Sequence, residues 1–289
     1  MHPSYPREDY GALFDAHIHT YFDYHDGTIS PQQLIQCTKQ RGFNWVLAMA
    51  HDTCRGAARI AKLAKDNGLP CISGIEVSTV HNHLLAYGVQ TWPYLRNTLS
   101  PDEAIEILRE QGCAIFLAHP YSNPRRVRQG MWYPEIVKKL DYDGIEWFNA
   151  TIYTQNAKTH EIYSNIPRGR RIAGTDSHHP STFGYSFTQV CTTSINPDDL
   201  VDAMRKGKCK AYNMHVPLHR TLYSVLASLS QNAIRKRKYI EGRWIKPIGD
   251  RPGSIIPDSY QGPLKNKGGK KARELYHERW LRAFFQKIS

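Results

Sequence analysis

Histidine and carboxylate residues recur through the first two thirds of the chain, and many of them fall where an apolar segment ends. The clearest spacing is His17-x-His19, inside the apolar segment 12–19. If this segment is a strand, both imidazoles lie on one face, because strand side chains alternate. Two imidazoles on one face can bind one divalent metal ion. Asp15 shares that face and is expected to accept a ring N–H from one of them.

Further residues with metal-binding side chains follow later apolar segments. They are His51, Glu76, His83, His119, Asp176 and His178. Histidine mixed with carboxylate suits zinc, manganese or iron. These ligands exceed what one ion needs, so we expect a cluster of two or three divalent ions, with a carboxylate such as Glu76 bridging two of them. The six cysteines are scattered without a C-x-x-C pair, which favours reduced thiols in a cytoplasmic protein over a thiolate zinc site.

The elements that must position these residues alternate between strands and helices. Apolar runs predict strands over residues 12–19, 45–50, 71–75, 83–87, 114–118, 144–148 and 171–174. Ser30-Pro31 and Ser100-Pro101 each begin a predicted helix, with Ser as the N-cap. Further helices are predicted over 54–67, 134–140 and 198–206. This alternation is typical of a parallel sheet covered by helices. In a (β/α) barrel the carboxyl ends of the strands meet at one rim, where we expect the metal-binding residues to gather.

An ordered set of short motifs resembles the PHP (polymerase and histidinol phosphatase) family and covers about residues 12–212. The motifs are Asp15-Ala-His17-Ile-His19-Thr20, Asp26-Gly27 with Ser30-Pro31, His51-Asp52-Thr53, Gly74-Ile75-Glu76-Val77-Ser78, His83-Leu84-Leu85, Ala118-His119-Pro120 and Gly174-Thr175-Asp176-Ser177-His178. The resemblance implies an α/β fold, a distorted seven-stranded (β/α) barrel. It also implies a metal-dependent phosphoesterase, in which a hydroxide that bridges two ions attacks the phosphorus atom.

The resemblance also implies how the ligands divide among the ions. His17 and His19 would hold the first ion together with Glu76 and Asp176. Glu76, His83 and His119 would hold the second. Asp26, His51 and His178 would hold the third.

Two departures from the family pattern affect the third ion. Ala50 stands where the family usually has an Asp before the His-Asp pair. The loop after His19 is longer than the common form, so Asp23, His25 and Asp26 are all candidates for its ligand.

Other residues near the motifs are expected to support the reaction. Asp176 and His178 are candidate catalytic residues, and His178 is a candidate proton donor to the leaving alkoxide. Asp52 is expected to hydrogen-bond a metal ligand without binding the metal itself. His81 and His179 are expected to contact substrate or water at the rim. Glu146 is expected to be a hydrogen-bonded rim carboxylate.

Three arginines, Arg125, Arg126 and Arg128, follow the His119-Pro120 pair. They form either a substrate-binding phosphate clamp or a solvated surface, and the sequence favours neither.

The positive charge of the chain is concentrated at its end. Residues 207–289 contain 18 Lys and Arg and 5 Asp and Glu, a net charge of +13, whereas residues 1–206 contain 20 and 21, a net charge of −1. We therefore divide the chain into a phosphoesterase barrel, 1–212, and a basic C-terminal extension, 213–289. The extension contains two amphipathic helical patterns, 218–234 and 272–288, and a Pro/Gly/Lys-rich stretch, 246–271. Such charge favours a polyanionic partner, which could be nucleic acid, another phosphorylated ligand or a membrane surface.

These features predict a phosphoesterase that acts on nucleotides or oligonucleotides. A small-molecule phosphomonoesterase resembling histidinol phosphatase is the first alternative, although a small substrate does not require the basic extension. An amidohydrolase is disfavoured because no lysine stands at a predicted strand end. A non-catalytic nucleic-acid-binding or assembly module is the last alternative. No apolar run of about 18 residues is present, so no membrane span is expected.

Overall fold

Two β-sheets and the helices around them form the body of the protein. The computed structural model describes residues 11–23, 27–92, 99–121, 131–151, 155–214 and 216–240. One sheet has six strands in the order β2-β3-β4-β5-β6-β7, and the other has three in the order β1-β8-β9. The strands are β1 (Ala12–Phe14), β2 (Val46–Ala48), β3 (Cys71–Ser78), β4 (His83–Tyr87), β5 (Ala114–Leu117), β6 (Gly144–Asn149), β7 (Arg171–Gly174), β8 (Ser186–Val190) and β9 (Cys209–Asn213).

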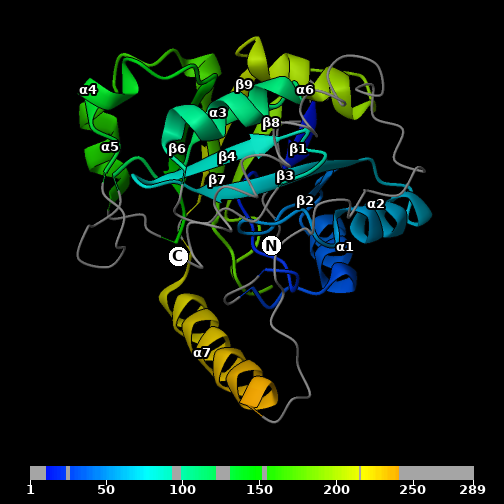
Figure 1. The fold of residues 1–289 in the computed structure, drawn as a ribbon. Helices are drawn as coiled ribbons and strands as arrows, with labels where there is room; N and C mark the ends of the chain where they lie inside the picture. The colour runs from blue at the N-terminus through cyan, green and yellow to red at the C-terminus, as the bar shows by residue number, and fades with distance from the viewer. Residues whose placement is uncertain are drawn as a thin grey trace, which may run out of the picture.

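The helices lie outside the sheets (Figure 1). They are α1 (Pro31–Gln40), α2 (Ala57–Asp66), α3 (Pro101–Glu110), α4 (Pro134–Val137), α5 (Asn156–Ile162), α6 (Pro197–Arg205) and α7 (Leu218–Ile240), with a short 3-10 helix η2 (Arg168–Arg170) before β7. The predicted caps of α1 and α3 are confirmed. In each helix the Ser side chain accepts from the third residue, whose own side chain accepts from the Ser backbone N–H.

Strand β1 and its continuation close the curled six-stranded sheet into a barrel. On one side, the backbone N–H of Trp45, next to β2, donates to the Leu13 carbonyl over 3.2 Å. On the other side, Asp176 donates to the His17 carbonyl and His19 donates to the Ser177 carbonyl, each over 2.8 Å. Strands β1 to β7 therefore surround one interior, and the prediction of an α/β fold with a distorted seven-stranded barrel is confirmed.

The direction of β4 differs from the prediction of a parallel sheet. Strand β4 runs antiparallel to both β3 and β5, and Ser78 pairs with His83. Only residues 79–82 connect β3 to β4, which is too short for the crossover that a parallel connection needs. This reversal puts His83, the first residue of β4, at the same rim as Glu76 near the end of β3.

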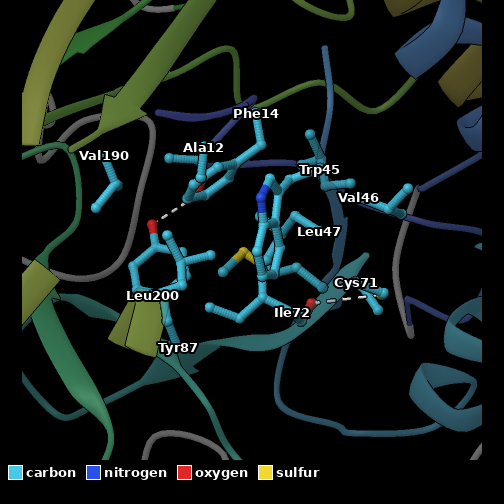
Figure 2. Close-up of a cluster of buried hydrophobic side chains, with 14 of the residues drawn as sticks. Ala12, Phe14, Trp45, Val46, Leu47, Cys71, Ile72, Tyr87, Val190 and Leu200 are labelled. Carbon is cyan, nitrogen blue, oxygen red and sulfur yellow. Dashed lines mark hydrogen bonds between the residues drawn. The ribbon is translucent and has the colours of Figure 1, made fainter. Parts of the chain in front are cut away.

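A buried apolar cluster supports the barrel beneath the β1 and β2 segments. Figure 2 shows Phe14 and Trp45 packed among Leu47, Ile72 and Tyr87. The hydroxyl of Tyr87 donates to the carbonyl of Ala16 over 2.6 Å, which ties β4 to the strand that carries His17.

Helix α7 projects away from the body (Figure 1). It is longer than the predicted helix over 218–234, and the second predicted helix, 272–288, lies outside the described residues. Within the described part of the chain, no helix combines the length and apolar character needed to cross a membrane.

Candidate metal centre

The Glu76 carboxylate lies at the centre of the histidines predicted to bind metal. Its Oε2 atom lies 3.2 Å from His19 Nε2, 3.3 Å from His17 Nε2 and 3.5 Å from His51 Nε2. Its Oε1 atom lies 2.7 Å from His83 Nδ1 and 3.0 Å from His119 Nε2. The two oxygens of one carboxylate thus face two different groups of imidazoles, which is the arrangement that a bridging ligand requires.

In three of these histidines, a second carboxylate contacts Nδ1, the ring nitrogen that faces away from Glu76. The Nδ1 atom of His17 lies 3.0 Å from Glu146, that of His19 lies 2.5 Å from Asp23, and that of His51 lies 2.9 Å from Asp52. A carboxylate accepts the Nδ1–H and leaves the lone pair on Nε2, which is the tautomer that binds metal. All three rings are therefore oriented with Nε2 available to a metal ion.

One buried atom tests whether these side chains fit a metal ion. The Nε2 atom of His17 is fully buried and has no hydrogen-bond partner among the residues that the structure describes. Buried polar atoms are normally satisfied, so an unpaired nitrogen that points at two carboxylates fits a bound cation. The donor set of imidazole and carboxylate fits a transition metal such as zinc, manganese or iron.

The backbone at this rim adopts unusual conformations. In the described ranges the non-glycine residues with positive φ are Asp52 (56°), His119 (24°) and Asp176 (54°). Each belongs to a predicted metal-site motif. Left-handed backbone costs free energy in a non-glycine residue and is concentrated at functional sites.

The electrostatics of the site couple the histidines to the carboxylates. Burial lowers the pKa of His17, but the charges of Asp176, Glu146 and Glu76 outweigh it and raise that pKa well above its ordinary value. Burial also lowers the pKa of His19, but the charge of Asp23 and the hydrogen bonds with Asp176 and Glu76 raise it well above its ordinary value. For Glu76 and Asp176 burial raises the pKa, but the surrounding imidazoles hold it well below its ordinary value. The carboxylates therefore favour the protonated rings of His17 and His19, and a metal ion bound there would compete with those protons.

The side chains form two groups whose ligand atoms lie within 4.8 Å of one another. One consists of His17, His19 and Asp176, and the other of His51, Glu76 and His83. The first group brings together residues predicted for the first ion. The second group contains Glu76 and His83, which were predicted for the second ion, together with His51, which the family resemblance assigns to the third ion. His119 lies against the same Glu76 oxygen as His83.

Of the residues predicted for the third ion, His51 and His178 are among the described residues, and both rings lie against the His19 ring, with the His51 centroid 5.8 Å away. The His178 ring stacks on the His19 ring, with centroids 4.0 Å apart, whereas His51 is grouped with Glu76 and His83. Asp26 and His25 lie outside the described residues, as do Arg125, Arg126 and Arg128. Asp23, the other loop candidate, is buried and contacts the outer nitrogen of His19 and the backbone N–H of His51.

Two carboxylates have different contacts from those that the sequence predicts. The prediction that Asp15 accepts a histidine ring N–H is wrong. Its hydrogen bonds come from Thr175, from the Gly184 backbone N–H and from the His17 backbone N–H. It therefore holds the β7 loop beside β1. Glu146 is hydrogen-bonded as expected, but it is fully buried beneath the rim and contacts His17 directly.

The two histidines predicted at the rim are partly buried. His81 lies in the turn between β3 and β4, where its backbone N–H donates to Thr79. The His179 ring lies 5.0 Å from the ring of Tyr223 in α7. The beginning of the basic extension therefore lies against the loop that carries His178.

The fold and this cluster of histidines and carboxylates define a PHP-type protein, and the chain belongs to the PHP family. The family model described as PHP-associated matches residues 170–209. An uncharacterized protein of Methanocaldococcus jannaschii is 31% identical over 145 residues, which are 47% of this chain and 81% of that protein. An error-prone DNA polymerase of Corynebacterium diphtheriae is 24% identical over 169 residues, which are 53% of this chain but only 16% of the polymerase.

Two solved structures share the fold. One is a two-domain protein from Bacteroides vulgatus that contains a predicted PHP-like metal-dependent phosphoesterase. It has a TM-score of 0.53 and 17% identity, and the match covers 71% of this chain and 66% of that one. The other is PsfC from Pseudomonas syringae, with a TM-score of 0.53 and 9% identity over 77% of this chain and 98% of that one.

Proposed function

We propose that this protein is a metal-dependent phosphoesterase that hydrolyses phosphoester bonds of nucleotides or oligonucleotides. The observation that carries the proposal is the position of Glu76 between two groups of imidazoles, three of which have a carboxylate behind them. A pair of divalent ions bound there would lower the pKa of a water molecule and neutralise charge on the phosphoryl oxygens.

The residues of the chain supply the positioning and one proton. The first ion would be held by His17, His19 and Asp176 with Glu76, and the second by Glu76 and His83 with His51 and His119. The Nδ1 atom of His178 lies 2.9 Å from the carbonyl of Asp176. A carbonyl only accepts, so Nδ1 carries its proton, and a protonated His178 has a second proton on Nε2. The side chain is 23% exposed and can reach a leaving alkoxide with that proton.

Three observations support a nucleic-acid substrate. The charge of +13 lies in residues 207–289, α7 begins beside His179, and the chain is similar to a segment of an error-prone DNA polymerase. Arg220 in the first turn of α7 lies 3.4 Å from the carbonyl of Ser181, which follows the His178 loop. The basic extension therefore starts beside the loop that carries His178 and His179.

A 5′-phosphorylated trinucleotide tests the reaction. Manganese-loaded protein is expected to release nucleoside monophosphate, and chelation is expected to abolish release. Asp176→Asn keeps a residue that tolerates left-handed backbone and is expected to lose at least about 100-fold in rate. Asp66→Asn, an exposed change on α2, is the matched control. Release of free phosphate alone would contradict the diesterase and favour a monoesterase. A metal-loaded protein without either activity would contradict hydrolysis of oligonucleotides and favour a small-molecule phosphomonoesterase or, failing that, a binding module.

Salt dependence tests the role of the extension. Residues 235–238 of α7 are Arg-Lys-Arg-Lys, and their replacement by glutamine is expected to weaken the binding of single-stranded oligonucleotide. The slope of log affinity against log salt should fall by about 0.7 for each phosphate that the variant no longer neutralises. An unchanged slope would show that these four residues do not bind phosphate.

A further inference from the structure

Strand β6 contains an irregularity directly beneath the metal centre. Glu146 pairs with Ile172 of β7, but Phe148 pairs with the next residue, Ala173, so Trp147 is an extra residue in β6. Such a β-bulge changes the direction in which later side chains point and is frequent beside active sites.

The bulge puts two polar side chains on the same face. In a regular strand, residues three apart point to opposite faces. Glu146 and Asn149 are three apart, yet they pair with Ile172 and Gly174, which share one face of β7. Both side chains are buried, at 1% exposure, and they meet: Asn149 Nδ2 lies 3.3 Å from each Glu146 oxygen.

The extra residue is held on the other side of the sheet. The Trp147 ring lies between the guanidinium of Arg171, 3.6 Å from its centroid, and the His160 ring, 4.1 Å away and nearly parallel. This stack holds Trp147 away from the face that carries Glu146 and Asn149, and the Phe148 ring also lies against His160, with centroids 5.0 Å apart. The bulge is therefore held from both faces.

The pair formed by Glu146 and Asn149 contacts candidate metal-binding residues from three segments of the chain. Glu146 Oε1 lies 3.0 Å from His17 Nδ1, and Oε2 accepts the backbone N–H of His119 over 2.6 Å. Asn149 Nδ2 also lies 3.3 Å from Asp176 Oδ2.

The orientation of the Asn149 amide follows from its other contact. Its Oδ1 atom accepts the backbone N–H of Thr151 over 3.1 Å, so Nδ2 faces the two carboxylates as a donor. The backbone of Asn149 is itself held by two hydrogen bonds with the Asn156 side chain, each 3.0 Å long.

We propose, building on the metal-binding half of the proposed function, that Glu146 and Asn149 act as a bulge-dependent pair of positioning residues. Glu146 keeps the proton of His17 on Nδ1 and fixes the turn at His119, and Asn149 holds the outer oxygen of Asp176. Neither residue binds the metal. They set the ligand geometry on the side of the site formed by His17 and Asp176.

Metal affinity tests the proposal without reference to hydrolysis. Glu146→Gln preserves shape but removes the charged acceptor, and it is expected to weaken manganese or zinc binding by about 10- to 100-fold. Asn149→Ala is expected to give a smaller loss, because its contact with Asp176 is long. Asp143→Asn is the matched control, since Asp143 is a buried carboxylate just before β6 that binds Arg109 and the Ile115 backbone instead of the site. It is expected to lower the unfolding temperature and leave metal affinity unchanged.

A second readout separates positioning from general stability. In the full-length protein loaded with zinc, ¹⁵N imidazole spectra are expected to show His17 protonated at Nδ1 alone, and Glu146→Gln is expected to alter that signal while Asp143→Asn does not. Unchanged metal affinity and an unchanged His17 signal in Glu146→Gln would overturn the proposal and leave the proposed function standing. Weakened metal binding in a protein whose wild type hydrolyses nothing would support the positioning role and contradict the enzyme. A wild-type protein that binds neither manganese nor zinc would overturn both.

Discussion

The Oδ2 atom of Asp52 lies 2.9 Å from Nδ1 of His51, and Asp52 holds this position with a left-handed φ of 56°. The same carboxylate accepts the backbone N–H and the hydroxyl of Ser78, each over 2.7 Å. Asp52 therefore joins the end of β2 to the end of β3 and fixes the ring of His51 at the same time.

This relationship predicts different effects for two substitutions of Asp52. Asp52→Asn tolerates the left-handed backbone but turns an N–H toward His51, which would shift the ring proton to Nε2 and block its lone pair. Metal affinity is expected to fall about 10-fold or more with little change in stability. Asp52→Ala is expected to show the same loss of metal affinity and, in addition, a loss of about 1–2 kcal/mol in unfolding free energy. Metal titration and urea unfolding check both, and wild-type affinity in Asp52→Asn would contradict the role.

The shared position of Glu76 predicts a loss of both ions together. Glu76→Gln is expected to lower metal content at both groups, because one oxygen faces His17 and His19 and the other faces His83 and His119. His83→Ala removes a ligand from one group only and serves as the comparison. Metal per protein, measured by elemental analysis after dialysis, should fall further in Glu76→Gln than in His83→Ala. Equal losses would argue against a bridging carboxylate.

The local features of the fold could be predicted from the sequence because they depend on neighbouring residues. The caps at Ser30 and Ser100 require only the side chain three positions on, and both formed as expected. The direction of β4 depends on the length of its connection to β3, and the four residues 79–82 already exclude a parallel crossover. That signal is present in the chain but is easily missed when strands are identified one by one.

The partners behind the histidines could not be predicted, because they depend on contacts between distant segments. Glu146 is 129 residues from His17, and Asn149 joins it on the same face of the sheet only because Trp147 is an extra residue in β6. Asp15 lies two residues from His17, yet its carboxylate accepts from Thr175 and Gly184, about 160 residues away. Residue type and position at strand ends identified the candidate ligands, whereas tertiary packing decides which carboxylate hydrogen-bonds to which imidazole ring.

The raised pKa values of the site predict that metal affinity depends on pH. His17 and His19 have pKa values well above the ordinary value, and that of His51 is raised to about 9. Below these values the rings are cationic, and metal binding must release their protons. Affinity is therefore expected to weaken as the pH falls from 8 to 6, by roughly 10-fold per pH unit for each proton displaced. Calorimetry in buffers of different ionisation enthalpy measures the protons released. A flat affinity without proton release would contradict the coupling.

The close approach of Gly174 to His17 predicts a large effect of a single methyl group. A Cβ added at Gly174 would lie 2.3 Å from the Cβ of His17 and 2.5 Å from its backbone nitrogen, so the β1 and β7 segments would have to separate. Gly174→Ala is expected to lower the unfolding free energy by about 3 kcal/mol. Gly68→Ala is the control, because no atom of the described residues lies within 4 Å of its added Cβ, and its φ of +72° is what opposes the change. It should cost about 1–2 kcal/mol. Urea unfolding distinguishes them, and equal losses would argue against the close approach.

The environments of the cysteines predict an order of reaction with a thiol reagent. All six are free, and Cys191 is exposed, whereas burial raises the pKa of Cys71, Cys113 and Cys209 to about 12. Because the thiolate is the reactive form, Cys191 is expected to react first, Cys37 more slowly, and the four buried thiols, which include Cys54, only after denaturation. Absorbance after addition of an aromatic disulfide reagent counts the thiols in each phase, and Cys191→Ser should remove the fast phase. Rapid reaction of three or more thiols in the folded protein would contradict the buried positions. A fast phase that survives in Cys191→Ser would show that another thiol is accessible.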